Sequence, residues 1–151
     1  IVLEAQLAAI AKVRPGNHWN EPHLAALEVI TRGLISLGLL KGRWRTQLKE
    51  EAFRPYYMHR TGHWLGMDVH DVGDYKVGDE WRMFEPGMVT TVEPGLYLSP
   101  IIKGLPKKWW NIGVRIEDDV LVTAQGHEVL THGAPKTVAE IESVMQLARV
   151  A

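Results

Sequence analysis

The stretch Met88-Val89-Thr90-Thr91-Val92-Glu93-Pro94-Gly95-Leu96-Tyr97 decides the fold of the second half of this 151-residue chain. Its first five residues are rich in β-branched side chains, and Pro94-Gly95 marks the turn before a second apolar run. Further runs of the same kind follow, with Asp118-Asp119 between two of them, so the pattern predicts short antiparallel strands. The predicted strands cover residues 88–92, 96–98, 112–116 and 120–123.

Helical patterns lie on both sides of these strands. An apolar stripe with spacings of four, three and three predicts a helix over residues 1–14. A second helix is predicted from Asn20-Glu21-Pro22 to near Gly38, and a short third one over residues 44–51. The stripe of the first helix consists of Leu3, Leu7, Ile10 and Val13.

A capping box opens the closing segment, because Thr137 precedes Glu140 by three residues. It predicts a last helix that packs on the core through one apolar face. The succession of helices, strands and a final helix predicts a single α+β domain, with helices on one face of an antiparallel sheet. The predicted apolar face of the last helix consists of Ile141, Val144, Met145 and Ala148.

Composition narrows the classes of function. The formal net charge is −1, which leaves no basic excess for nucleic acid or an acidic membrane. The chain contains no cysteine, so disulfides and thiolate metal sites are excluded. No apolar run reaches the length of a membrane span and no signal peptide is recognisable, so a cytoplasmic setting is expected. Three lysines near Trp109-Trp110 are interpreted as a solvated loop, and His18 and His23 as surface or capping groups.

Three histidines fall within twelve positions, at His59, His63 and His70, close to Asp68 and Asp71. The spacing of the first two resembles a helical zinc pair. However, the residue after His59 is arginine rather than a general-base glutamate, and glycines interrupt the segment. A loop with structural histidines is an alternative. The density of imidazoles and carboxylates nevertheless indicates metal ligands or proton carriers.

Two carboxylates, Glu93 and Glu117, end apolar runs that are expected to be buried strands. A buried carboxylate is costly unless a cation or a hydrogen-bond donor satisfies it. Taken alone, Glu93 is equally compatible with a residue that faces a turn. Glu117 alone is equally compatible with an exposed member of an acidic turn with Asp118 and Asp119. Together with the histidines they indicate a divalent metal held by carboxylates and one imidazole. That ligand set suits Mn²⁺, with Zn²⁺ and Co²⁺ as alternatives.

Three segments, residues 59–73, 85–97 and 111–119, resemble the C-terminal half of the Xaa-Pro aminopeptidases (aminopeptidase P). These enzymes belong to the pita-bread metallopeptidases. The resemblance implies the C-terminal part of a pita-bread fold, which is a curved antiparallel sheet with helices packed on one face. It also implies two divalent metal ions and the release of the N-terminal residue from peptides that have proline in second position.

The resemblance assigns roles to matched residues. His63, Glu93 and Glu117 are similar to metal ligands, Glu117 to the one that bridges two ions. Glu93 also resembles the residue that takes a proton from the attacking water. The remaining matched positions resemble groups that bind substrate or steady the site. His59 and His70 are similar to histidines that stabilise the tetrahedral intermediate, and Tyr97 and Arg115 to residues that orient the others.

The family also uses two aspartate ligands on a hairpin that precedes the first helix seen here. All six aspartates of this chain lie at or beyond Asp68, so none matches that hairpin. Residues 1–151 are therefore expected to be the C-terminal portion of the catalytic domain, without the N-terminal domain and the upstream hairpin. Their partner would be that missing part of the same protein. The isolated chain is expected to be inactive or weakly active, and the family often forms dimers or tetramers.

The same motifs are compatible with other classes of protein. A prolidase, which cleaves only Xaa-Pro dipeptides, shares the local sequence. Methionine aminopeptidase fits less well because tryptophan-rich stretches such as Trp109-Trp110 do not resemble it. A non-catalytic pita-bread binding module is a third reading, although it would be expected to have lost ligands. Arg60-Thr61, between two of the histidines, differs from some family members and could alter specificity.

Overall fold

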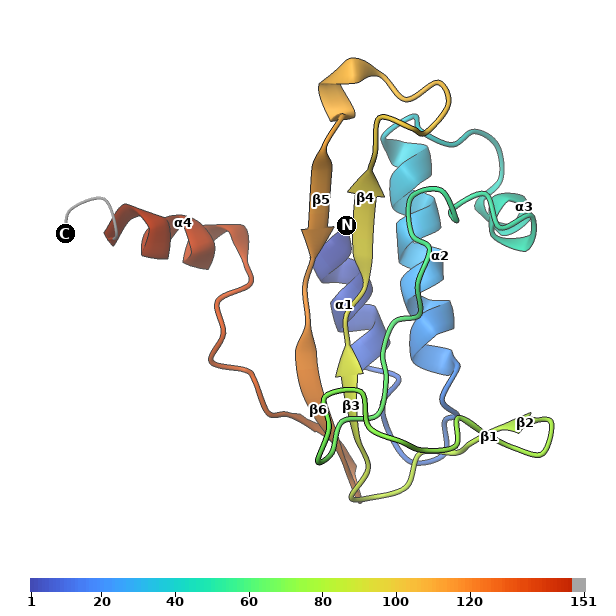
Figure 1. Ribbon diagram of the computed structural model, residues 1–151, viewed down its shortest axis with the longest axis vertical. Coiled ribbons are helices and arrows are strands. Elements are labelled where there is room, and N and C mark those ends of the chain that lie inside the picture. The colour runs from blue at the N-terminus through green and yellow to red at the C-terminus, as the bar shows by residue number, and fades with distance from the viewer. Residues whose placement is uncertain (148–151) are drawn as a thin grey trace.

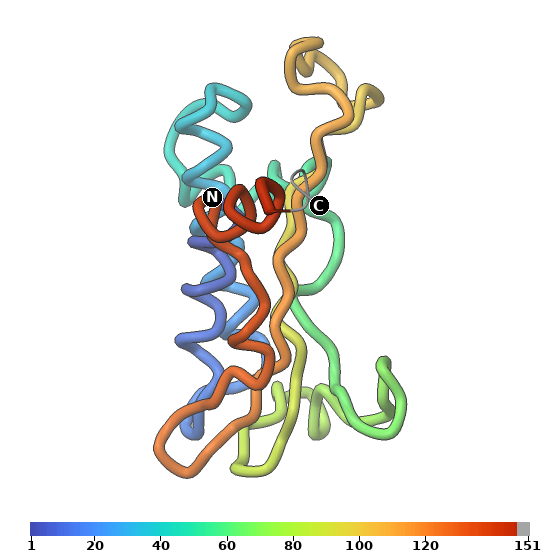
Figure 2. Tube along the Cα trace, turned by 90° about the vertical axis from the view of Figure 1, so that its left-hand side faces the viewer, coloured from blue at the N-terminus to red at the C-terminus, as the bar shows by residue number. Residues whose placement is uncertain are grey.

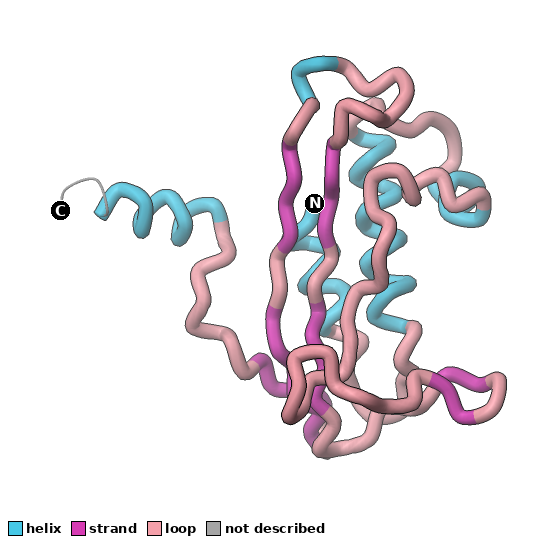
Figure 3. The backbone as a smooth tube through the Cα atoms, in the orientation of Figure 1, coloured by secondary structure: helices cyan, strands magenta, loops and turns pink. Residues whose placement is uncertain are grey.

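The computed structural model describes residues 1–147, and its elements are arranged around one long, kinked ribbon of strands (Figure 1). Three helices come first, and a closing helix ends the described chain (Figure 3). The helices are α1 (Val2–Ile10), α2 (Glu21–Ser36), α3 (Trp44–Lys49) and α4 (Val138–Leu147), and η1 (Lys107–Trp109) is a short 3-10 turn. The strands are β1 (Lys76–Val77), β2 (Glu80–Trp81), β3 (Val89–Val92), β4 (Gly95–Leu98), β5 (Ile112–Arg115), β6 (Asp118–Thr123) and β7 (Gly126–Val129).

The ribbon is formed by two antiparallel pairs that follow each other along the same chain segments. β3 pairs with β6 and ends at the register Val92 with Asp118. β4 pairs with β5 and begins at the register Gly95 with Arg115. Residues 93–94 and 116–117 thus face each other at an interruption between the two pairs. β7 adds to the free edge of β6, which makes a three-stranded sheet in the order β3, β6, β7.

Helices α1 and α2 lie together on one side of the ribbon (Figure 2). Small residues allow them to approach closely, because Ala5, Ala9 and Ala26 are fully buried. A β-carbon on Gly33 would meet the side chain of Ile1 at 2.7 Å. The helices and the buried face of the ribbon enclose one apolar core that includes Ile30, Leu34, Val92, Val120 and Val122. The α+β class with helices on one face of an antiparallel sheet is confirmed.

Residues 61–65 run beside β3 on the edge opposite β6. Glu93 N donates to Thr61 O at 2.7 Å, Thr91 N to His63 O at 3.0 Å, and Leu65 N to Val89 O at 3.2 Å. Gly62 permits this approach, since a β-carbon there would collide with the carbonyl oxygen of Thr91. The histidine-containing segment is therefore fixed to the strand that ends at Glu93.

Several elements differ from the sequence predictions. The first helix ends at Ile10 rather than at residue 14, and its buried face carries Ala5 and Ala9, whereas Leu7 is exposed. Small side chains at these two positions suit the close contact with α2, and the predicted Ile10 is buried as well. The strands β1, β2 and β7 were not predicted, since they are too short or too polar to give a clear apolar alternation.

The closing helix α4 begins with the predicted capping box: Glu140 N donates to Thr137 Oγ1, and Thr137 N donates to Glu140 Oε2. Its predicted packing on the core is wrong. Ile141, Val144 and Met145 are all exposed, and α4 projects away from the ribbon (Figure 1). Ala148, the fourth residue of that face, lies outside the described residues. No helix among residues 1–147 is both long and apolar enough to cross a membrane.

Candidate metal centre

Glu93 and Glu117 leave the ribbon at the interruption between its two strand pairs. Glu93 follows β3 directly, and Glu117 lies between β5 and β6 on the facing segment. The side chain of Glu93 is 13% exposed, but Glu117 is exposed and all four residues of β5 are too. The expectation of a buried strand before Glu117 is therefore wrong. The break in the ladder, rather than burial, brings the two carboxylates together.

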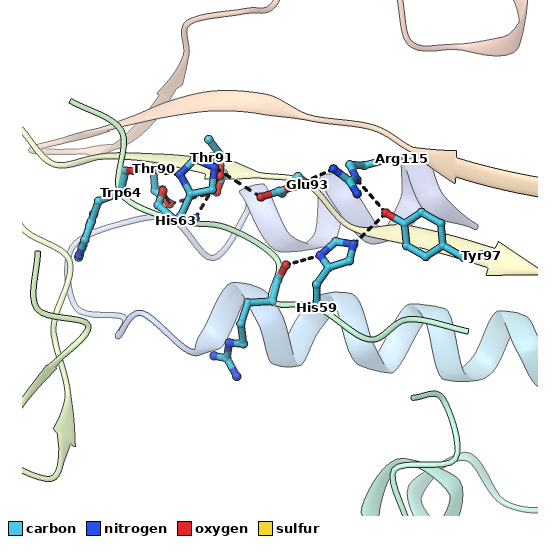
Figure 4. Close-up of polar contacts among 9 residues, drawn as sticks. His59, His63, Trp64, Thr90, Thr91, Glu93, Tyr97 and Arg115 are labelled. Carbon is cyan, nitrogen blue, oxygen red and sulfur yellow. Dashed lines mark hydrogen bonds and ion pairs between the residues drawn. The ribbon is translucent and has the colours of Figure 1, made fainter. Parts of the chain in front are cut away.

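His63 directs its unprotonated ring nitrogen, Nε2, toward these carboxylates. Its Nδ1 lies 2.9 Å from the carbonyl oxygen of Trp64, which can only accept a hydrogen bond, so Nδ1 carries the proton. The neutral ring consequently has its lone pair on Nε2, which lies 3.6 Å from Glu93 Oε1 (Figure 4). A metal-ligating histidine commonly has this arrangement, with the outer nitrogen held by a backbone carbonyl. The backbone of His63 is held as well, since its N donates to Thr91 Oγ1 at 3.1 Å.

The three groups form one compact donor set. Single ligand atoms of His63, Glu93 and Glu117 lie within 4.8 Å of one another, as the sequence predicted for a metal site. Partial burial raises the pKa of Glu117, and the charge of Glu93 raises it further, while His63 lowers it. Two carboxylates close enough to repel each other, together with an imidazole whose lone pair points at them, fit a divalent cation.

One ion pair and two hydrogen bonds lead from this cluster to His59. Arg115 Nη1 lies 3.6 Å from Glu93 Oε2, and Arg115 Nε donates to Tyr97 Oη at 2.7 Å. Tyr97 Oη lies 2.8 Å from His59 Nε2 (Figure 4). Because His59 Nδ1 lies 2.7 Å from the carbonyl oxygen of Arg60, the neutral ring has its proton on Nδ1 and accepts from Tyr97 at Nε2. The structure thus links four residues that the resemblance singled out, namely Glu93, Arg115, Tyr97 and His59.

This geometry qualifies the predicted role of His59. The resemblance makes His59 a donor to the tetrahedral intermediate, yet its Nε2 accepts from Tyr97 in the structure. Donation from Nε2 therefore requires that the bond to Tyr97 opens or that the ring gains a proton. His70, the other predicted intermediate-binding histidine, stands edge-on to His63 with 4.3 Å between ring centroids. It is exposed, on the segment that follows Trp64.

An aromatic groove beside the cluster was not predicted from the sequence. It has a volume of about 640 Å³. Trp19 and Tyr75 pack with 4.7 Å between ring centroids, and the Arg60 guanidinium lies over the Trp81 ring at 5.1 Å. Arg60 is exposed and forms part of the groove wall. The lining residues are Trp19, His59, Arg60, Gly62, His63, Tyr75, Trp81, Glu93 and Arg115.

Replacing Glu117 by glutamine should have opposite effects without and with metal. In the metal-free protein the raised pKa of Glu117 means that its ionisation opposes folding, so Glu117→Gln should raise the melting temperature at pH 7. This gain should vanish as the pH falls through the ordinary value of 4.5, where the carboxyl group is protonated in both states. With a divalent ion at about 100 times its Kd, wild type should gain about 2.7 kcal/mol that the variant lacks.

Thermal unfolding at pH 7 and pH 4, with EDTA or with Mn²⁺, measures both effects. Glu128→Gln is the matched control, because Glu128 is an exposed carboxylate on β7 outside the cluster. A variant that keeps the full Mn²⁺-induced rise in melting temperature would show that Glu117 is not a ligand.

The donor set is of the carboxylate–imidazole kind that binds divalent metal ions. Comparison with known proteins agrees: the model of Metallopeptidase family M24 matches residues 1–124. The chain belongs to this metallopeptidase family, and the family implies divalent metal ions. The fold is the corresponding part of the pita-bread fold. The structure of Pseudomonas aeruginosa aminopeptidase PepP matches with a TM-score of 0.96 and 59% identity, over 99% of this chain and 34% of that one.

Other similar proteins carry related names. Aminopeptidase P from Escherichia coli, solved with the inhibitor Pro-Leu, has a TM-score of 0.93 and 43% identity, over 99% of this chain and 34% of that chain. The Xaa-Pro aminopeptidase of Haemophilus influenzae is 46% identical over 96% of this chain and 33% of its own length. The chain thus spans about a third of the length of the relatives it matches.

Proposed function

We propose that this chain is the C-terminal portion of the catalytic domain of an Xaa-Pro aminopeptidase. The whole protein would release the N-terminal residue from peptides that have proline in second position. The observation that carries the proposal is the cluster of His63, Glu93 and Glu117 at the break of the ribbon. Support comes from relatives named Xaa-Pro aminopeptidase that are 43–46% identical over nearly the whole chain. The family's two aspartate ligands would come from a part of the protein outside residues 1–151.

His63 Nε2 and the carboxylates of Glu93 and Glu117 would hold the metal ions, which we propose to be Mn²⁺, with Zn²⁺ and Co²⁺ as competitors. Bound divalent ions polarise the scissile carbonyl and make a water molecule acidic. Glu93 would take the proton from that water, because its carboxylate is the least exposed of the cluster and is steadied by Arg115. Tyr97 would orient Arg115 and His59 around the substrate carbonyl.

The aromatic groove would receive the substrate next to these groups. Trp19, Tyr75 and Trp81 offer apolar faces of the kind on which a proline ring packs, and Arg60 and Arg115 bring positive charge to the same space. His70, beside His63, lies where it would contact the developing oxyanion of the tetrahedral intermediate. These roles are consistent with a hydrolase that holds a short peptide by its end.

Peptide length distinguishes this proposal from its alternatives. The full-length protein with Mn²⁺ is expected to release the first residue from an Xaa-Pro-Xaa tripeptide with a kcat/KM at least about 10-fold above that for the matched Xaa-Pro dipeptide. Liquid chromatography of the products measures both rates, and a tripeptide with alanine in place of proline is the control. Cleavage of the dipeptide alone would establish a prolidase. No cleavage of any peptide by the metal-loaded protein would establish a binding module.

A further inference from the structure

His23 lies in the first turn of α2 and makes a contact that links this helix to the metal-binding segment. The sequence predicted a surface or capping group. In the structure the side chain is half-buried and its Nδ1 lies 2.7 Å from Thr61 Oγ1, across 38 residues of sequence. Thr61 is almost fully buried, so this bond is shielded from water. The prediction of a surface residue is wrong.

The hydroxyl of Thr61 has a second partner, Tyr57 Oη, also at 2.7 Å. Tyr57 is only 1% exposed, so its phenolic proton needs an acceptor inside the protein. The bonds therefore run in one direction: Tyr57 donates to Thr61, and Thr61 donates to His23 Nδ1. This direction requires neutral His23 with its proton on Nε2. The reverse direction would leave the buried phenol of Tyr57 without an acceptor. Acceptance of both bonds by Thr61 would leave the proton of its own buried hydroxyl without one.

Burial keeps His23 in that state. It lowers the pKa of His23 to about 3, and the positive charges of Arg60, His59 and Arg54 act in the same direction. Burial also raises the pKa of Tyr57. Both shifts favour the neutral groups near pH 7, which keeps the pattern of donors and acceptors constant there.

Thr61 is the point at which this network meets the metal centre. Its carbonyl oxygen accepts the hydrogen bond from Glu93 N at 2.7 Å. It also lies two residues after His59 and two before His63, and the Tyr57 ring stands edge-on to the His59 ring at 4.9 Å between centroids. Fixing the side chain of Thr61 consequently fixes the backbone that supports one carboxylate ligand and two functional histidines.

We propose that His23 is a positioning residue, which acts through Thr61 to hold His63 and Glu93 at the spacing that a metal ion requires. The inference rests on the proposed function for its effect on turnover, but its effect on metal binding does not depend on the substrate. His23 itself touches neither metal ligand. Its contribution is comparable to that of the outer hydrogen-bond partners of metal ligands, whose loss costs about 10–100-fold in affinity or activity.

Three substitutions in the full-length protein test whether His23 positions the proposed ligands or only fills space in the core. His23→Leu keeps the bulk but removes the acceptor, and His23→Asn keeps an acceptor oxygen near the position of Nδ1. Thr61→Val replaces the hydroxyl with a methyl group and so removes the bonds to both His23 and Tyr57. His132→Leu is the control, because His132 is exposed in a turn far along the chain. Each variant is measured for melting temperature, Mn²⁺ dissociation constant, and kcat and KM on an Xaa-Pro-Xaa peptide.

We expect His23→Leu and Thr61→Val to weaken Mn²⁺ binding and to lower kcat by about 10-fold each, with KM within about 2-fold of wild type. His23→Asn should recover most of both losses. The double variant His23→Leu/Thr61→Val should be no worse than Thr61→Val alone, because Thr61→Val already removes the bond to His23. In the metal-free wild type, NMR of the imidazole nitrogens should show His23 neutral with its proton on Nε2.

Equal Mn²⁺ affinity in His23→Leu, His23→Asn and wild type would overturn the inference, as would additive losses in the double variant or a proton on Nδ1. If His23→Leu does not fold, the comparison of Thr61→Val with wild type decides. If wild type cleaves no proline peptide, the proposed function fails, while the Mn²⁺ affinities and the NMR result still decide the role of His23.

Discussion

The Glu93→Gln variant of the full-length protein is expected to cleave an Xaa-Pro-Xaa peptide about 10³-fold more slowly than wild type. Glutamine keeps the size of the side chain and removes the base, and loss of a positioned general base typically costs 10²–10⁴-fold. The substitution also replaces a charged carboxylate, which we propose as a metal ligand, with a neutral amide. The loss should appear in kcat, because the aromatic groove that would receive the substrate is unchanged.

Initial rates with saturating Mn²⁺ measure this effect, and they should be taken after Mn²⁺ content has been checked for each protein. Glu128→Gln again serves as the control, since its carboxylate lies on β7 outside the cluster. A Glu93→Gln protein that keeps more than a tenth of wild-type kcat would show that this carboxylate neither accepts the proton nor holds the metal.

The 151-residue chain by itself is expected to bind Mn²⁺ at least about 100-fold more weakly than the full-length protein and to show no measurable turnover. It supplies His63, Glu93 and Glu117, whereas the family resemblance requires two further aspartates. A divalent ion held by three ligands on an exposed surface loses much of its coordination free energy. Glu117 is exposed in the chain, which is consistent with a metal ligand whose site is completed by residues outside this chain.

Isothermal titration with Mn²⁺ and the tripeptide assay test this expectation on the two proteins side by side. Circular dichroism is needed first, to show that the shorter chain is folded. Turnover by the folded 151-residue chain at the full-length rate would refute the division of the metal site between two parts of the protein.

Much of the fold could be predicted because the strands carry strong local signals. The β-branched run before Glu93 places β3 and β4 within one residue of their observed bounds. The turn predicted at Pro94-Gly95 is wrong, because the chain continues in the same direction there and only the ladder is interrupted. The capping box of Thr137 and Glu140 also marked the start of α4 correctly. The core face of α1 could be predicted only in part: Ile10 and, beyond the helix end, Val13 are buried as expected. Ala5 and Ala9 were missed, because periodicity shows where apolar residues lie but not how narrow the contact with α2 is.

The proposed metal ligands could be named before the structure was known, whereas their supporting contacts could not. The family resemblance singled out His63, Glu93 and Glu117, and the structure places one donor atom of each within 4.8 Å of the others. Their meeting point depends on the break in the ladder between residues 93–94 and 116–117, which follows from strand register. The contact of His23 with Thr61 had no sequence signal, because it joins residues 38 positions apart on a helix and a loop.

The site itself is tested most directly by an anomalous difference map from crystals of the full-length protein grown with Mn²⁺. The account predicts density about 2.0–2.3 Å from His63 Nε2 and from carboxylate oxygens of both Glu93 and Glu117. A map with no anomalous density among these three side chains, or with Mn²⁺ bound only elsewhere in the protein, would contradict it.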